Sequence, residues 1–96
     1  MAFFVERRLR SVGHRLAGAR EELRITDEQL LHFADITDDS RIRAMVSETP
    51  SADEDHRHAE RTSSAMARHR VELIETILRL EAEQDELLDK LSARGR

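Results

Sequence analysis

Midway along the chain the sequence reads Ser47-Glu48-Thr49-Pro50-Ser51-Ala52-Asp53-Glu54. Pro50 lacks a backbone N–H and disfavours helical geometry at Thr49, so a helix that arrives from the N-terminal side must stop here. Ser51 and Glu54 have the spacing of a capping box, in which the serine hydroxyl accepts from the N–H of Glu54 and the glutamate reaches back. The sequence therefore predicts a helix ending near residue 47, a turn over about 48–51 and a second helix over about 52–93.

An apolar repeat runs through the first helix, which is expected over about 3–47. Its members are separated by alternating steps of four and three residues, the a/d pattern by which a helix presents one seam to a partner helix. They are Val5, Leu9, Val12, Leu16, Ala19, Leu23, Thr26, Leu30 and Phe33. Only Thr26 is polar, so this seam is well defined.

A second repeat with the same alternation runs through the second helix. Its members are Ala59, Ser63, Met66, Arg70, Leu73, Ile77, Leu80, Gln84, Leu87 and Leu91. Arg70 is interpreted as a polar layer that sets the register, paired with Thr26 or Asp27 on the facing helix.

Two arms of nearly equal length favour an all-α fold, a long antiparallel helical hairpin resembling a coiled coil and forming one domain over 1–96. Three Gly, one Pro and 38% charged residues agree with long helices more than with sheets. The charge distribution agrees with the antiparallel arrangement, because five Arg against one Glu in residues 1–20 would face the acidic stretch Glu81–Asp89.

The first helix is not expected to be uniform. Ile36, Ile42, Met45 and Val46 leave the track of the earlier apolar repeat, which indicates a change of phase. A kink or short interruption is therefore predicted near 35–38.

The second helix carries a further apolar stripe beside its seam. The stripe consists of Val71, Ile74, Leu78 and Leu88, and it makes the apolar face wider than one facing helix can cover. We expect two hairpins to associate through it as a homodimer, a four-helix bundle, because closed two-fold pairs are the commonest oligomers. The alternative is that the stripe docks an unidentified protein partner.

Two polar groups near the turn are candidate sites. The acidic tip comprises Glu48, Asp53, Glu54 and Asp55, which either solvate and cap the helix ends or meet a basic partner surface. Metal ligands could come from Asp38, Asp39, His56, His58 and Glu60, although His56 and His58 are two residues apart and point in different directions. The simpler interpretation is that these histidines are exposed polar residues, so no metal or other cofactor is assigned.

Several classes of function find little support. The sequence has no Gly-rich phosphate loop, nucleophile elbow or zinc-helix motif, so no catalytic residue is assigned and an enzyme is not expected. The absence of Trp and Tyr and the net charge of −4 disfavour nucleic-acid binding. A membrane association is disfavoured because the apolar run at Phe3-Phe4-Val5 is short. A chain without cysteine suits the cytoplasm, and fifteen Arg among sixteen basic residues hint at a GC-rich bacterial genome.

The expected function is a non-enzymatic protein–protein interaction module, a dimeric hairpin that serves as a scaffold or regulatory adaptor. A second hypothesis is an acidic-tipped regulator of a large machine such as RNA polymerase. In outline such a hairpin resembles the coiled-coil finger of Gre-type transcription factors, but the carboxylate motif of that family's tip is not matched by Glu48, Asp53, Glu54 and Asp55. A third hypothesis is a helical bundle that binds a metal through carboxylates and histidines.

Overall fold

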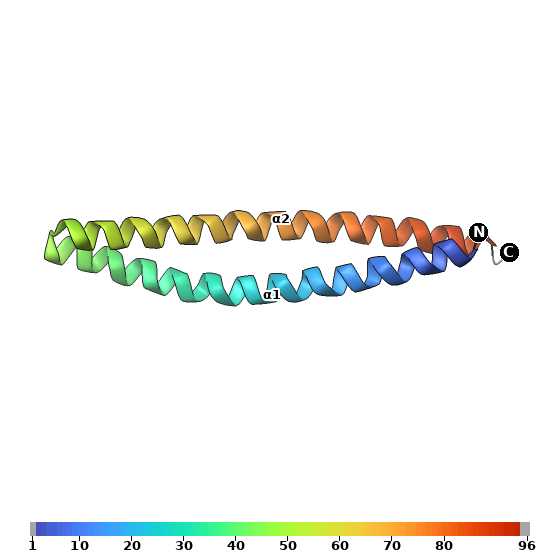
Figure 1. Cartoon of the computed structure of the whole chain (residues 1–96), viewed down its shortest axis with the longest axis horizontal. Coiled ribbons are helices and arrows are strands. Elements are labelled where there is room, and N and C mark those ends of the chain that lie inside the picture. The colour runs from blue at the N-terminus through green and yellow to red at the C-terminus, as the bar shows by residue number, and fades with distance from the viewer. Residues whose placement is uncertain (1, 95–96) are drawn as a thin grey trace. The chain divides into compact units, whose positions relative to one another are not determined.

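The chain folds into two long helices (Figure 1). The structure, a computed structural model, describes residues 2–94, with α1 spanning Ala2–Ser47 and α2 spanning Pro50–Arg94. No strand occurs in this part of the chain. The prediction of an all-α helical hairpin is confirmed at this level.

The turn between the helices is shorter than the sequence predicts, because only Glu48 and Thr49 lie outside them. Glu48 has a φ of 50°, in the left-handed region, and its N–H donates to the carbonyl oxygen of Ala44 over 3.2 Å. This single bond from the residue after the helix to the carbonyl four residues back is the αL motif that ends many helices. In this motif the residue directly after the helix is usually glycine, so Glu48 holds a backbone conformation that is unfavourable for a residue with a Cβ.

The capping box predicted at Ser51 and Glu54 is wrong. The Thr49 hydroxyl caps α2 by accepting from the N–H of Ala52 over 3.2 Å, and Pro50 is the first helical residue. Proline suits that position because its fixed φ is helical and its missing N–H would have had no partner there. Pro50 therefore begins the second helix two residues before the predicted start.

Of the kink or short interruption predicted near 35–38, the interruption does not occur, since α1 is helical throughout that range. The less exposed positions continue in the phase of the first seam, from Phe33 to Thr37, Ser40 and Ala44. The apolar residues leave the seam while the helix keeps its phase. Hydroxyl and small side chains then take the inward positions.

Residue contacts group the chain into two units, which are described separately. Unit 1 contains the beginning of α1, up to Leu23, and the end of α2, from Glu72; unit 2 contains residues 24–71. Each unit therefore consists of one segment of α1 and one segment of α2.

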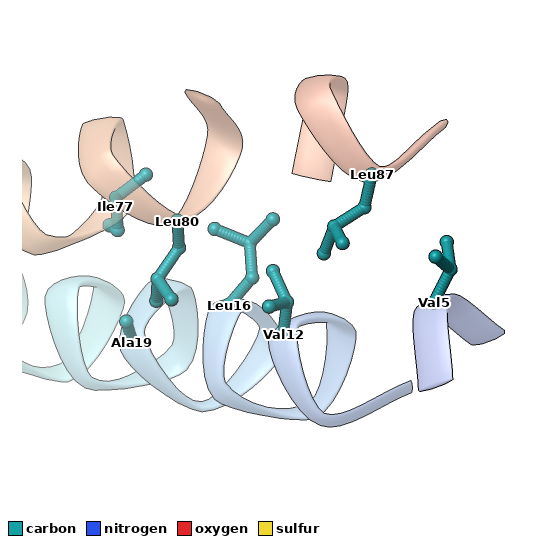
Figure 2. Packing of buried hydrophobic residues seen from close by; sticks show 7 residues of the cluster. All are labelled: Val5, Val12, Leu16, Ala19, Ile77, Leu80 and Leu87. Atoms are coloured by element: carbon teal, nitrogen blue, oxygen red, sulfur yellow. The ribbon is translucent and has the colours of Figure 1, made fainter. Parts of the chain in front are cut away.

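Unit 1 has an aliphatic core between its two helical segments (Figure 2). The buried members are Val5, Val12, Leu16, Ala19, Ile77, Leu80 and Leu87, with Leu9, Leu23 and Leu91 packed against them. Leu73 is buried as well, and Val12 and Leu16 are the most completely covered side chains, at 0% and 2% exposed. Figure 2 shows side chains from the two helices pointing into the space between them. The two repeats meet here, with Leu16 and Leu80 in one cluster.

Unit 2 has a different interior. Its buried side chains are Thr26, Ser40 and Ala59, while Leu30, Phe33 and Met66 are only partly buried. The Arg70 side chain donates from Nε to Asp27 across the helices over 2.6 Å, which confirms the predicted polar layer. Each member of that pair is about half exposed, so water weakens the attraction between the charges.

Candidate interaction surfaces

Two ion pairs join the helices of unit 1. Arg8 Nε lies 2.6 Å from Glu83 Oε1, and Arg20 Nη2 lies 3.2 Å from Glu81 Oε2. The hydrogen bond from Arg8, followed by the charges of Arg8 and Arg15, lowers the pKa of the Glu83 carboxyl. The same hydrogen bond raises the pKa of Arg8. The basic beginning of α1 thus faces the acidic stretch of α2, as expected for antiparallel helices.

The α2 stripe lies largely in water. Val71, Leu78 and Leu88 are 54%, 60% and 48% exposed, and Ile74 is partly buried. Val71 is the last residue of unit 2 and the other three belong to unit 1. No side chain of residues 2–94 covers these aliphatic groups to the extent seen in the core.

The acidic tip is exposed at all four positions, Glu48, Asp53, Glu54 and Asp55. Glu54 does not reach back to a capping position. Its carboxylate instead lies 3.2 Å from Arg61 Nη2 and 3.3 Å from Arg57 Nη2, both on the same helix. The hydrogen bond from Arg61 and the charges of Arg57 and Arg61 lower the pKa of Glu54. The tip is thus partly neutralised by its own helix.

The candidate metal ligands are not brought together as a set. His56 Nε2 lies 2.6 Å from Glu60 Oε1, and His56 Nδ1 lies 3.1 Å from the Ser40 hydroxyl, so both ring nitrogens have partners. Asp39 pairs with Arg43. Among residues 2–94, no group of three His, Asp or Glu side chains could hold a metal ion. Asp38 and His58 therefore join no ligand set with His56 and Glu60.

The surface that sequence reasoning missed lies on α1 in unit 2, and we call it the outer face. It consists of Leu31, Asp35, Asp38, Ile42, Met45 and Val46, whose spacing of three, four or seven residues places them on one side of a helix. Leu31, Ile42, Met45 and Val46 are 73%, 54%, 67% and 80% exposed. Continuing the first seam in phase past Phe33 would have revealed it, because that track leads to Thr37, Ser40 and Ala44 and leaves the apolar residues outside.

A further exposed group lies at the beginning of α1 in unit 1, and we call it the Phe–Arg surface. It consists of Phe3, Phe4, Arg7 and Arg10, all exposed, with the two phenylalanines 62% and 64% exposed. The rings lie edge to face, with centroids 5.9 Å apart. Phe3, Arg7 and Arg10 share one side of the helix by their spacing of four and three residues.

Comparison with known proteins identifies no relative: the chain matches no protein-family model, no curated protein and no solved structure. Within the described residues, neither helix has a segment long and apolar enough to cross a membrane.

Proposed function

We propose that the chain is a non-enzymatic protein–protein interaction module, a cytoplasmic scaffold or regulatory adaptor that acts as a homodimer of helical hairpins. The observation that carries this proposal is the exposure of Val71, Leu78 and Leu88, at 54%, 60% and 48%. Burying one such side chain gains roughly 1.5–3 kcal/mol, which is large beside the net stability of a small domain. A surface of this kind is stabilised by a protein partner.

A second copy is the proposed partner for the α2 stripe. An isologous interface places the same residues on both sides, so each copy's Ile74 and Leu78 would contact the same apolar stripe of the other. Two hairpins joined in this way make a four-helix bundle. The unidentified protein that the dimer scaffolds would bind elsewhere on its surface.

The test is the mass of the chain in solution. Multi-angle light scattering at micromolar concentration and about 0.5 M salt, which screens contacts between exposed charges, should give twice the mass of one chain. Leu78→Asp should reduce the mass to that of one chain under the same conditions, because it places a charge in the apolar contact. Ala65→Asp introduces the same charge at an exposed position of α2 away from the stripe and should leave the dimer intact. A single-chain mass for the unmodified protein would contradict the proposal.

A second candidate function is an acidic-tipped regulator of a larger assembly such as RNA polymerase. It is favoured by the exposure of Glu48, Asp53 and Asp55 beside the two-residue turn. Affinity capture with the intact chain and with a triple variant, Asp53→Ser, Glu54→Ser and Asp55→Ser, separates it from the scaffold. Loss of one large partner in the variant alone would support it, and an unchanged set of partners would count against it.

A further inference from the structure

The outer face of unit 2 reverses the usual distribution of side chains on a surface helix. Past Phe33 the inward positions of α1 hold Thr37 and Ser40, while Met45 and Val46 lie on another side of the helix and are 67% and 80% exposed. A helix normally places its apolar stripe against its neighbour and its polar residues in water. The reversal indicates that the outer face, and not only the inner one, has a binding partner.

The charges on this face restrict what can cover it. Asp35 and Asp38 lie between Leu31 and Ile42, and neither makes an ion pair with another described residue. If two copies met through the same face, these carboxylates would oppose one another, and facing like charges are destabilising. The face therefore fits a surface that is apolar and basic.

The chain itself carries such a surface. The Phe–Arg surface presents two exposed rings beside Arg7 and Arg10, and neither arginine makes an ion pair with a residue in the described part of the chain. Arg8, in contrast, is held by Glu83 and is not available. Aromatic side chains and arginine are the residues most enriched where proteins bind one another.

We propose that the outer face of unit 2 binds the Phe–Arg surface of a second copy of the chain. Phe3 and Phe4 of one molecule contact Ile42, Met45 and Val46 of the other. Arg7 and Arg10 of the first molecule pair with Asp35 and Asp38 of the second.

The order of residues on the two surfaces allows both sets of contacts at once. Phe3 precedes Arg7 and Arg10, whereas Asp35 and Asp38 precede Met45, so antiparallel helices bring apolar to apolar and base to acid. At 1.5 Å per residue, the apolar and charged groups are about 8 Å apart on one surface and about 12 Å apart on the other. The flexible arginine side chain spans the difference of about 4 Å.

This contact joins two unlike surfaces, so two copies can make it once or reciprocally, and further copies can add where one surface of each kind stays unoccupied. It uses none of Val71, Ile74, Leu78 and Leu88. The experiment is therefore done in the Leu78→Asp chain, where failure of the proposed dimer and failure of this contact give different results.

Sedimentation velocity over a concentration series measures this association. In the Leu78→Asp chain the average mass should rise with concentration at about 0.05 M salt and fall towards one chain at about 0.5 M, because salt screens exposed charges. Arg7→Glu with Arg10→Glu should weaken association at least about tenfold, and Asp35→Arg with Asp38→Arg should do the same. Arg68→Glu, an exposed charge reversal outside both surfaces, should have no such effect.

Mixing the two reversed variants in equal amounts gives the decisive measurement. Each variant alone carries surfaces of like charge, while the mixture restores opposite charges and should regain the mass of the unreversed chain. Circular dichroism checks that every variant keeps its helix content. A mixture that stays at the mass of one chain, or a reversed variant that associates like the unreversed chain, would overturn the proposal.

Discussion

Unit 1 and unit 2 use the same helical spacing with different residues at the inward positions. In unit 1 the inward positions hold Val12, Leu16 and Leu80, which are almost fully covered. In unit 2 the buried positions hold Thr26 and Ser40, and large apolar side chains such as Leu31 lie outside. The difference teaches that the period of a helix and the polarity of its residues are separate signals, and that the period alone determines which side faces the neighbour.

The largest expected effect tests whether unit 1 is the more strongly packed unit. Leu16→Ala removes a side chain that is only 2% exposed and leaves a cavity, so it should lower the free energy of unfolding by about 2–5 kcal/mol. Leu30→Ala is the matched change in unit 2 and should cost less, since Leu30 is only partly buried. Urea unfolding followed by circular dichroism at one chain concentration measures both. Equal losses would show that the two interiors contribute alike.

The next effect concerns the turn. The stability of unit 2 depends on the turn more than that of unit 1 does, because the interior of unit 2 is poor in aliphatic groups. Thr49→Ala removes the hydroxyl that accepts from the Ala52 N–H and should cost about 1 kcal/mol. Ser51→Ala is the control, because Ser51 lies inside α2 and does not cap it. Thermal unfolding of the two variants compares them directly. A larger loss for Ser51→Ala would restore the capping box that the sequence predicts.

A smaller effect of opposite sign is expected one residue earlier. Glu48→Gly should raise the free energy of unfolding by about 0.5–1 kcal/mol, because glycine adopts a φ of 50° without the steric cost of a Cβ. Glu48→Ala keeps the Cβ and should give no such gain. Chemical denaturation of the two variants separates backbone strain from the loss of the carboxylate, which both variants share.

The smallest effect distinguishes an ion pair between helices from one within a helix. Arg8 lowers the pKa of Glu83 below the ordinary value of 4.5, so the stabilisation is present above that value and is lost as pH falls through the folded value. Arg8→Gln should raise the pKa of Glu83 towards 4.5 and make unfolding less dependent on pH in that window. Nuclear magnetic resonance titration of the carboxyl carbon measures the pKa.

The control for this titration is Arg61→Gln in unit 2. It should raise the pKa of Glu54 in the same way, because the hydrogen bond from Arg61 is the main cause of its lowering. Both residues belong to α2, so this pair does not join the helices. Only the first variant removes an ion pair that joins α1 to α2.

Much of the fold follows from residue order alone. The alternation from Val5 to Phe33 predicts a helix with one buried side because leucine and valine occupy nearly every inward position. The same reasoning fails near Ile36, because there the apolar residues leave the seam while the helix keeps its phase. Hydroxyl side chains can fill inward positions where they bond to their own helix, as Thr37 does to the Phe33 carbonyl over 2.8 Å.

The turn and the surfaces were harder to predict for physical reasons. Pro50 was interpreted only as the end of the first helix. Its fixed φ and missing N–H, which stop one helix, also suit the first residue of the next. The α2 stripe could be named from spacing at Ile74 and Leu78, but sequence periodicity does not say what covers a face. The metal hypothesis relied on His56 and Asp38. The structure instead pairs His56 with Ser40 and Glu60, and these pairings depend on which side-chain rotamers the helices allow.

The hydroxyls inside unit 2 have a consequence for how the chain tolerates change over evolution. Thr37 donates to the carbonyl of Phe33, and Ser40 donates to the carbonyl of Thr37 over 2.9 Å, so both donors are satisfied within α1. Thr37 therefore requires little of the opposite helix beyond small size, whereas the Ser40 hydroxyl also lies 3.1 Å from His56 Nδ1 of α2. Natural variants should therefore exchange serine, threonine and alanine more freely at position 37 than at position 40, while selection acts more strictly on the shapes of the leucines in unit 1.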